Sequence, residues 1–193
     1  MELNSGMIDN QIHTMLRPLE HTDFDQLVCW LNAPHVLRWW DGEVDADAVL
    51  SRYGPRLSKD SPTRVYVIEA GALPVGIVQC YRHAAYPDWD RAVGIQKAAG
   101  IDYLIGDVDS TGKGIGSNAI RLIAQIAFDL YPEVDVIVSA PQKANLGSCK
   151  AIEKAGFSCI DERKLDSNCP SDSGISSIYV LHRPGSVHSA IKR

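Results

Sequence analysis

Residues 100–130, with the sequence GIDYLIGDVDSTGKGIGSNAIRLIAQIAFDL, decide the fold of this chain. The first seven are apolar apart from Asp102, and their β-branched and aromatic side chains predict a strand. In the last sixteen, apolar residues recur every three or four positions, which predicts an amphipathic helix that lies on a sheet. The glycine-rich turn GKGIGS at 112–117 joins the two. A strand, a glycine turn and a helix therefore follow one another in this part of the chain.

The predicted helix at 115–130 has two distinct sides. The side expected to face the sheet carries Ile115, Ala119, Leu122, Ile123, Ile126, Ala127 and Leu130. The opposite side carries Arg121, Gln125 and Asp129. This division predicts a helix that covers a sheet and exposes only one face to solvent.

The rest of the chain alternates between helical and strand patterns. Strands are predicted at 14–19, 64–70, 75–81, 134–139, 157–163 and 176–182, and helices at 22–31, 46–53 and 148–154. A turn at Gly71 and Pro74 joins two of these strands into a hairpin. The order predicts an α/β (α+β) fold with a central, mostly antiparallel mixed sheet flanked by helices. It lacks the strict alternation of a doubly wound fold.

The composition limits the class of protein. The 193 residues suffice for one domain with a real core, expected at 13–184 between flexible ends at 1–12 and 185–193. Nineteen basic against 24 acidic residues leave a net charge of −5, which disfavours nucleic-acid binding. No apolar run approaches the roughly 20 residues that span a bilayer, and residues 1–11 lack the pattern of a secretory signal. We therefore expect a cytoplasmic protein, monomeric or homodimeric, with neither a nucleic acid nor a membrane as partner.

The five cysteines contain no C-x-x-C pair and no zinc-ligand spacing. We therefore expect reduced thiols that behave as small hydrophobic residues, and no metal site. A nucleophilic cysteine is the alternative, but it would need a nearby base, and the sequence points to none.

The glycine turn is a candidate phosphate site, because glycines let the backbone approach a ligand and a helix start presents unpaired N–H groups. A Walker loop is excluded, since Gly114 follows Lys113 where serine or threonine is required. A dinucleotide fingerprint would need Ala119 in place of its third glycine and would normally follow the first strand. A turn with a purely structural role is the other alternative.

Residues 111–116, TGKGIG, resemble the [QR]-x-x-G-x-[GA] loop of the GNAT acyltransferases, with Thr111 in place of Gln or Arg. Some thirty residues on, residues 145–157 resemble the family's N-x-x-[AS]-x-x-x-[YF]-E-K-x-G-F motif. The resemblance implies the GNAT fold, with acetyl-CoA as co-substrate and no metal. It assigns the acetyl-CoA site to Leu104, Ile105, Gly106, Thr111, Gly112, Lys113, Gly114, Gly116, Ser117, Asn145 and Ser148.

Ile152 departs from the second motif. The residue before Glu153-Lys154 is often a tyrosine in the family, where it protonates the departing CoA thiolate, and isoleucine has no proton to give. Another group or water would protonate the thiolate, or it would leave unassisted. Since the pKa of a thiol is roughly 8.5, unassisted departure is tolerable.

The N-terminal half resembles the aminoglycoside 6′-N-acetyltransferases. Residues 30–43 match W-L-N-x-x-H-x-x-x-W-W-x-G-E, residues 74–81 match P-V-G-x-x-Q-x-Y, and GID stands at 100–102. The resemblance covers most of residues 16–157. It implies acetylation of the 6′-amine of an aminoglycoside antibiotic, which confers resistance, by direct transfer in a ternary complex.

A polycationic sugar should be held by carboxylates and an aromatic wall. Candidate substrate-binding residues are Trp39, Trp40, Tyr81, Asp88 and Asp102. We expect one of the two adjacent tryptophans to face the pocket and the other to pack in the core. The alternative is that both pack in the core. Asp88 and Asp90 lie in an expected polar loop, where they either bind substrate or are merely solvated. With Asp102 they would place part of the net negative charge at the pocket.

Asp102 is the candidate catalytic residue. It interrupts an apolar strand, and an unpaired buried carboxylate is costly, so it needs a partner or a function. Its match to the family's G-I-D position implies that it binds the 6′-ammonium and accepts its proton, directly or through water. A capped aspartate with a structural role is the alternative.

Three other functions remain open. A GNAT enzyme acting on another amine, such as a siderophore-precursor hydroxylysine, should have basic pocket residues in place of Asp88 and Asp102. A protein or ribosomal N-terminal acetyltransferase is a second option. A non-catalytic acyl-CoA-binding domain, suggested by Ile152, should bind CoA without turnover. The segment 165–177 is either a substrate-contacting or a plain surface loop.

Overall fold

The computed structural model describes residues 13–40, 42, 44–167 and 173–185. The expected leader at 1–12 and residues 186–193 of the expected tail lie outside this part. Within it, seven strands form one sheet: β1 (Thr14–Pro18), β2 (Thr63–Ala70), β3 (Leu73–Arg82), β4 (Ala98–Ile105), β5 (Val136–Ser139), β6 (Ser158–Arg163) and β7 (Ser176–His182). Their order across the sheet is β1-β2-β3-β4-β5-β7-β6, and every neighbouring pair is antiparallel except β4–β5. The expected fold class is confirmed.

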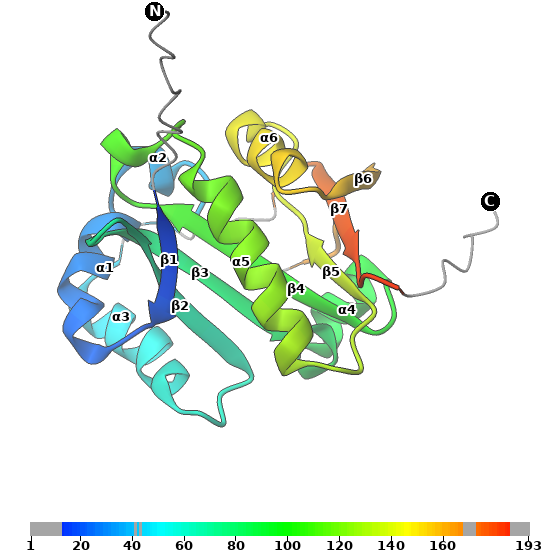
Figure 1. The fold of residues 1–193 in the computed structure, drawn as a ribbon, viewed down its shortest axis with the longest axis horizontal. Coiled ribbons are helices and arrows are strands. Elements are labelled where there is room, and N and C mark those ends of the chain that lie inside the picture. Colours follow the sequence, from blue (N-terminus) through cyan, green and yellow to red (C-terminus); the bar gives the residue numbers. More distant parts are fainter. Residues whose placement is uncertain (1–12, 41, 43, 168–172, 186–193) are drawn as a thin grey trace, which may run out of the picture.

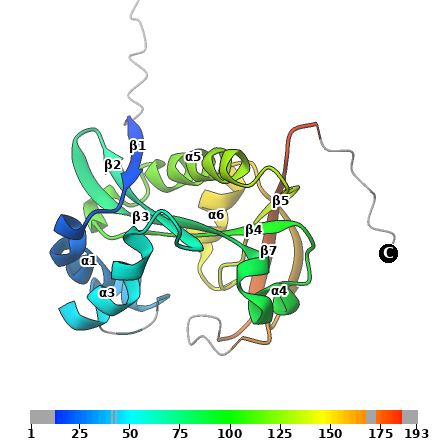
Figure 2. The ribbon, with the colours of Figure 1, turned by 90° about the horizontal axis from the view of Figure 1, so that it is seen from below.

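Helices cover both faces of the sheet (Figures 1 and 2). The α-helices are α1 (Phe24–Leu31), α2 (Pro34–Leu37), α3 (Ala46–Tyr53), α4 (Pro87–Val93), α5 (Ile115–Leu130) and α6 (Leu146–Lys154). The 3-10 turns are η1 (His21–Asp23), η2 (Gly54–Leu57), η3 (His83–Ala85) and η4 (Val108–Ser110). Figure 2 shows α5 on one side of the sheet and α1, α3 and α4 on the other. α6 shares the core of α5 through Cys149 and Ile152.

The buried side of α5 differs in part from the expected one. Leu122 and Leu130 are exposed, whereas Ala124 and Phe128 are buried against the sheet. Around the helix, the buried face is narrower than the stripe of apolar residues. Residues at both edges of that stripe contact solvent, because a helix that lies on a sheet is covered on one side only. The exposed positions of Arg121, Gln125 and Asp129 agree with the prediction.

Residues 87–93 form a helix that the sequence pattern did not predict. The expected polar loop around Asp88 is wrong, because α4 begins at Pro87 and ends at Val93, with Gly94 as the capping residue after it. Proline is favoured at the first helical position, and Gly94 takes the left-handed conformation (φ 70°) that commonly ends a helix. Val93 anchors this short helix in a cluster with residues of β5 and β7.

The sheet splits between its two parallel strands. β4 pairs with β5 only from Ala98 to Gly100, opposite Val136 to Val138. Along β3, by contrast, β4 is paired up to Ile105. The half of β4 that contains Asp102 is therefore held from one side, and the split leaves room for a ligand beside it.

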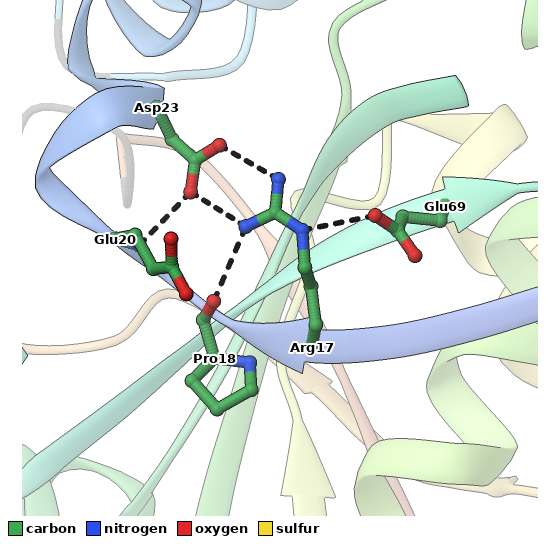
Figure 3. A network of polar contacts seen from close by, with 5 residues as sticks. All are labelled: Arg17, Pro18, Glu20, Asp23 and Glu69. Carbon is green, nitrogen blue, oxygen red and sulfur yellow. Dashed lines mark hydrogen bonds and ion pairs between the residues drawn. The ribbon is translucent and has the colours of Figure 1, made fainter. Parts of the chain in front are cut away.

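An ion-pair network ties β1 to the start of α1 (Figure 3). Arg17 donates from both terminal nitrogens to the two oxygens of Asp23, at 2.7 Å each, and from Nε to Glu69 of β2 at 2.9 Å. The same Asp23 accepts from the backbone N–H of Glu20 at 2.9 Å, as in a capping box. Arg17 lowers the pKa of Asp23 and fixes the direction in which the chain enters the helical layer.

The described cysteines are unpaired thiols. Cys80 and Cys149 are buried, and burial raises the pKa of Cys80 to about 12, so it is no nucleophile at neutral pH. Cys29 and Cys159 are exposed thiols, and Cys169 lies outside the described residues. No helix in the described part is long and apolar enough to cross a membrane.

Candidate active site

A cavity of about 1190 Å³ runs along the split in the sheet. Residues of both sheet faces line it, together with the turn before α5, the start of α6, and α2 and α4. All five predicted substrate-binding residues line it: Trp39, Trp40, Tyr81, Asp88 and Asp102. Of the predicted acetyl-CoA residues, it is lined by Leu104, Ile105, Thr111, Gly112, Gly114, Gly116, Ser117, Asn145 and Ser148. Gly106 and Lys113 are not among the lining residues.

The glycine turn has the backbone that its sequence requires. Gly112 and Gly114 have φ angles of 71° and 84°, which residues with a side chain rarely adopt, and α5 begins directly afterwards. The first backbone N–H groups of α5, from Ile115 to Ser117, have no carbonyl one turn earlier within the helix to bond. They are thus suited to bind an anion, with the positive end of the helix dipole behind them.

The ammonium group of Lys154 in α6 lies beside this turn. Lys113 is exposed and does not line the cavity. The Nζ of Lys154 lies 3.6 Å from the position that a Cβ on Gly114 would occupy, and Lys150 of the same helix also lines the cavity. The sequence did indicate Lys154 through the E-K-x-G-F motif, but the motif did not reveal that its side chain reaches back to the turn.

The end of β4 is held by contacts that limit what its backbone can bind. Gly106 donates its N–H to the carbonyl of Val75 at 2.8 Å, and a Cβ on it would lie 2.0 Å from Trp30. Gly106 therefore serves packing at this strand end, and it does not line the cavity. The carbonyl of Ile105 lies 2.8 Å from His35 Nε2, so α2 holds this strand end in place.

The start of α6 carries an ordered polar pair. Asn145 caps the helix by accepting the N–H of Ser148 at 3.1 Å. The Ser148 hydroxyl accepts a hydrogen bond from Tyr103 of β4 at 3.2 Å. One turn on, Ile152 is fully buried in the core shared with α5.

Asp102 belongs to a chain of hydrogen bonds. Gln79, its direct partner on β3, donates from Nε2 to Asp102 Oδ2 at 2.9 Å. The other end of the Gln79 amide accepts from Arg56 Nη1 at 2.7 Å, and the Arg56 guanidinium lies over the ring of Tyr53. Asp102 is half-buried, so the cost of its carboxylate is offset by this partner. Sequence analysis missed Arg56 and Gln79 as site residues.

Aromatic rings line the same cavity as this carboxylate. Trp39 and Trp40 both line the cavity, so the expectation that only one would do so is wrong. Trp40 also packs against the cluster of α1 and α3, while Arg38 covers Trp39. The ring of Tyr81 lies so close to Gly100 that a Cβ there would be 2.5 Å from it. Only glycine at this position leaves space for that ring beside Asp102.

Acidic and basic residues are balanced along the cavity. Asp88, Asp102 and Asp166 line it, but so do Arg56, Lys150 and Lys154. Asp88 is exposed and pairs with Arg91 at 3.1 Å, and Asp90 lies 3.9 Å from the buried His83 and outside the lining. Of the three aspartates expected to give the pocket a negative charge, Asp88 and Asp102 line the cavity and Asp90 does not. Among the described residues no group of His, Cys, Asp or Glu is arranged to hold a metal ion.

A family model described as an acetyltransferase (GNAT) domain matches residues 20–165. The chain belongs to the GNAT acetyltransferase family. This GNAT enzyme is 30% identical over 146 residues to an aminoglycoside N(6′)-acetyltransferase type 1 of Klebsiella pneumoniae, with 74% of this chain and 72% of the relative covered. A kanamycin resistance protein of Rhizobium radiobacter is 36% identical over 58 residues, which are 30% of this chain and 53% of that protein.

Solved structures extend the likeness of this GNAT chain to three dimensions. The crystal structure of the aminoglycoside acetyltransferase AAC(6′)-Ib with coenzyme A and kanamycin superposes with a TM-score of 0.76 at 26% identity, covering 89% of this chain and 95% of that one. A complex of the same enzyme with ribostamycin and coenzyme A gives the same TM-score, covering 88% and 93%. The expectations of the GNAT fold and of an acyltransferase are thereby confirmed.

Proposed function

We propose that this chain transfers the acetyl group of acetyl-CoA to the 6′-amine of aminoglycosides, and so confers resistance to them. One observation carries the proposal: a single cavity joins an anion-binding helix start at one end to a carboxylate among aromatic rings at the other. This arrangement suits a phosphate-bearing acyl donor and an amine-bearing sugar. The complexes of AAC(6′)-Ib with coenzyme A and with kanamycin support both assignments.

Different residues bind the acyl donor, bind the amine and accept its proton. Gly112, Gly114 and the first turn of α5 bind the pyrophosphate, and Lys154 adds a positive charge there. Asp102 binds the 6′-ammonium and accepts its proton, which frees the nitrogen lone pair. The amine attacks the thioester carbonyl, and a backbone N–H of β4 stabilises the oxyanion. The transfer is direct, so no covalent acyl-enzyme forms.

Trp39, Trp40 and Tyr81 are proposed to form the wall against which the sugar packs, with Asp88 binding a further ammonium at the rim. The proposal treats residues 13–184 as one catalytic domain. It places the enzyme in the cytoplasm, where its acyl donor is found, as a monomer or homodimer. Sedimentation or size-exclusion measurements on the full chain distinguish these two states.

A second candidate substrate is an amine that also carries an anionic group, such as hydroxylysine. Arg56 favours it, because its guanidinium lines the cavity and is two hydrogen bonds from Asp102. A polycation would meet repulsion from this charge, whereas a carboxylate would be attracted.

A thiol-release assay with acetyl-CoA against kanamycin, tobramycin, hydroxylysine and a peptide separates the candidates. Turnover with kanamycin or tobramycin supports the main proposal, and turnover with hydroxylysine alone supports the second. CoA binding without release from any amine would indicate a non-catalytic acyl-CoA-binding domain.

A further inference from the structure

The split between β4 and β5 opens the cavity to both faces of the sheet. Asp102 and Tyr103 follow the last paired residue, Gly100, and both line the cavity. Because successive side chains of a strand point to opposite faces, these two reach the split from opposite sides. A reacting group that lies in the split is thus accessible to a carboxylate from one face and to a phenol from the other.

The Tyr103 hydroxyl is fixed beside the proposed donor site. It donates to Ser148 at 3.2 Å, and Ser148 is itself held at the capped start of α6. A Cβ on Gly116 would lie 3.2 Å from Cε2 of Tyr103, so the ring lies against the first turn of α5. Burial raises the pKa of Tyr103 to about 12, so the hydroxyl keeps its proton and remains a donor at neutral pH.

Acetyl transfer creates a need for such a donor. As the C–N bond forms, the C–S bond breaks with its electron pair going to sulfur, and the amine proton goes to Asp102. The thiol of coenzyme A has a pKa of roughly 8.5, and its thiolate is stabilised by any hydrogen bond that the sulfur accepts. Ile152, one turn beyond Ser148 on α6, is buried and apolar and offers none.

We propose that Tyr103 donates a hydrogen bond from its hydroxyl to the acetyl-CoA sulfur and to the thiolate that leaves. Tyr103 keeps its own proton, because it is a weaker acid than the thiol, and the thiolate takes a proton from water after departure. In the absence of sulfur, the Ser148 hydroxyl accepts the hydrogen bond from Tyr103 and so orients the donor beforehand. The inference rests on the acetyl-CoA part of the proposed function and is independent of the amine that accepts the acetyl group.

Calorimetric titration with coenzyme A and with desulfo-coenzyme A, which lacks the sulfur, tests this contact without any amine. At pH 8 we expect the wild-type chain to bind coenzyme A about 10-fold more tightly, and the ratio to rise towards pH 9 as the thiol ionises. In Tyr103→Phe the ratio should fall to about one. Tyr179→Phe is the matched control, since the Tyr179 hydroxyl donates to Glu153 and its ring does not line the cavity.

A wild-type ratio near one overturns the inference without any variant, and so does a ratio in Tyr103→Phe equal to that of the wild type. In turnover, Tyr103→Phe should lower kcat about 10-fold and leave KM for acetyl-CoA within about 2-fold, because the contact strengthens as the C–S bond breaks. If no aminoglycoside is acetylated but the binding ratios behave as stated, the proposed substrate fails and the role of Tyr103 stands.

Discussion

Gln79 and Asp102 face each other across β3 and β4, and the Gln79 amide donates to the Asp102 carboxylate at 2.9 Å. Arg56 occupies the carbonyl end of the same amide, so the amide can present only its N–H to Asp102. One carboxylate oxygen is therefore held by the sheet. Asp102 also lines the cavity, so this contact orients a carboxylate that a ligand can reach.

Asp102→Asn should abolish most of the activity, because an amide binds an ammonium weakly and accepts no proton. We expect kcat to fall by about 100-fold or more, the usual contribution of a general base. The thiol-release assay at saturating acetyl-CoA measures this with kanamycin as acceptor. Asp88→Asn is the comparison, since Asp88 is exposed and paired with Arg91, and it should change mainly KM. A near-full rate in Asp102→Asn would remove Asp102 from the chemistry.

Gln79→Leu should lower kcat about 10-fold with little change in KM for acetyl-CoA. The variant removes a hydrogen bond to a charged group, which contributes about 1.5–3 kcal/mol, and with it a contact that orients Asp102. Gln125→Leu is a matched control, because Gln125 also donates to an aspartate, Asp129, but on the exposed face of α5. Equal rates for the two variants would show that Gln79 does not position Asp102.

Lys154→Met should weaken coenzyme A binding about 10-fold, and Lys113→Met less than 3-fold. The ammonium group of Lys154 reaches the turn at Gly114 and Lys154 lines the cavity, whereas Lys113 of the turn itself does not line it. A cation beside a bound pyrophosphate contributes through charge-assisted hydrogen bonds, which a lysine outside the cavity lining does not form. Calorimetry at two salt concentrations measures both effects. A larger loss in Lys113→Met would reverse the assignment.

Gly106→Ala should destabilise the fold by about 3 kcal/mol. A Cβ at this position would lie 2.0 Å from Trp30, a buried ring that cannot move without disturbing the cluster of α1 and α3. Gly147→Ala should change the free energy of unfolding by less than about 1 kcal/mol, because the nearest atom to its Cβ is 3.8 Å away. Urea unfolding measures both. A small effect of Gly106→Ala would mean that Trp30 has space to shift.

The parts of this site that could be predicted from sequence are those encoded by neighbours along the chain. The turn at Gly112–Ser117 and the strand before it are local patterns, and α3, predicted at 46–53, occupies those residues in the structure. α4 was missed because its seven residues are too few to show a helical apolar repeat, and its only strong signals are Pro87 and Gly94 at the ends.

The relationships that give the site its chemistry depend on contacts between distant segments. The pairing of Gln79 with Asp102 follows from the register of β3 on β4, which no local pattern of either strand reveals. Arg56 reaches the same pair from a 3-10 turn before β2. Tyr103 became a candidate only when the structure placed its hydroxyl on Ser148, 45 residues further along the chain.

His83 should make the stability of the protein depend on pH. It is 1% exposed between Tyr81 and Trp89, neither ring nitrogen has a hydrogen-bond partner among the described residues, and burial lowers its pKa to about 4. Asp90, 3.9 Å away, offsets this only in part. In the unfolded chain the pKa of histidine is about 6.5, so the unfolded state binds the proton more tightly.

The stability that comes from a neutral His83 is therefore fully present above pH 6.5 and is lost as the pH falls toward 4. Between pH 7 and pH 5 this loss amounts to about 2 kcal/mol of the free energy of unfolding. His83→Phe keeps an aromatic ring between Tyr81 and Trp89 but cannot be protonated, so its unfolding free energy should fall less over the same range. Urea titrations of both proteins at the two pH values give the difference. Identical pH dependence in the two would show that His83 takes up its proton without cost in the folded state.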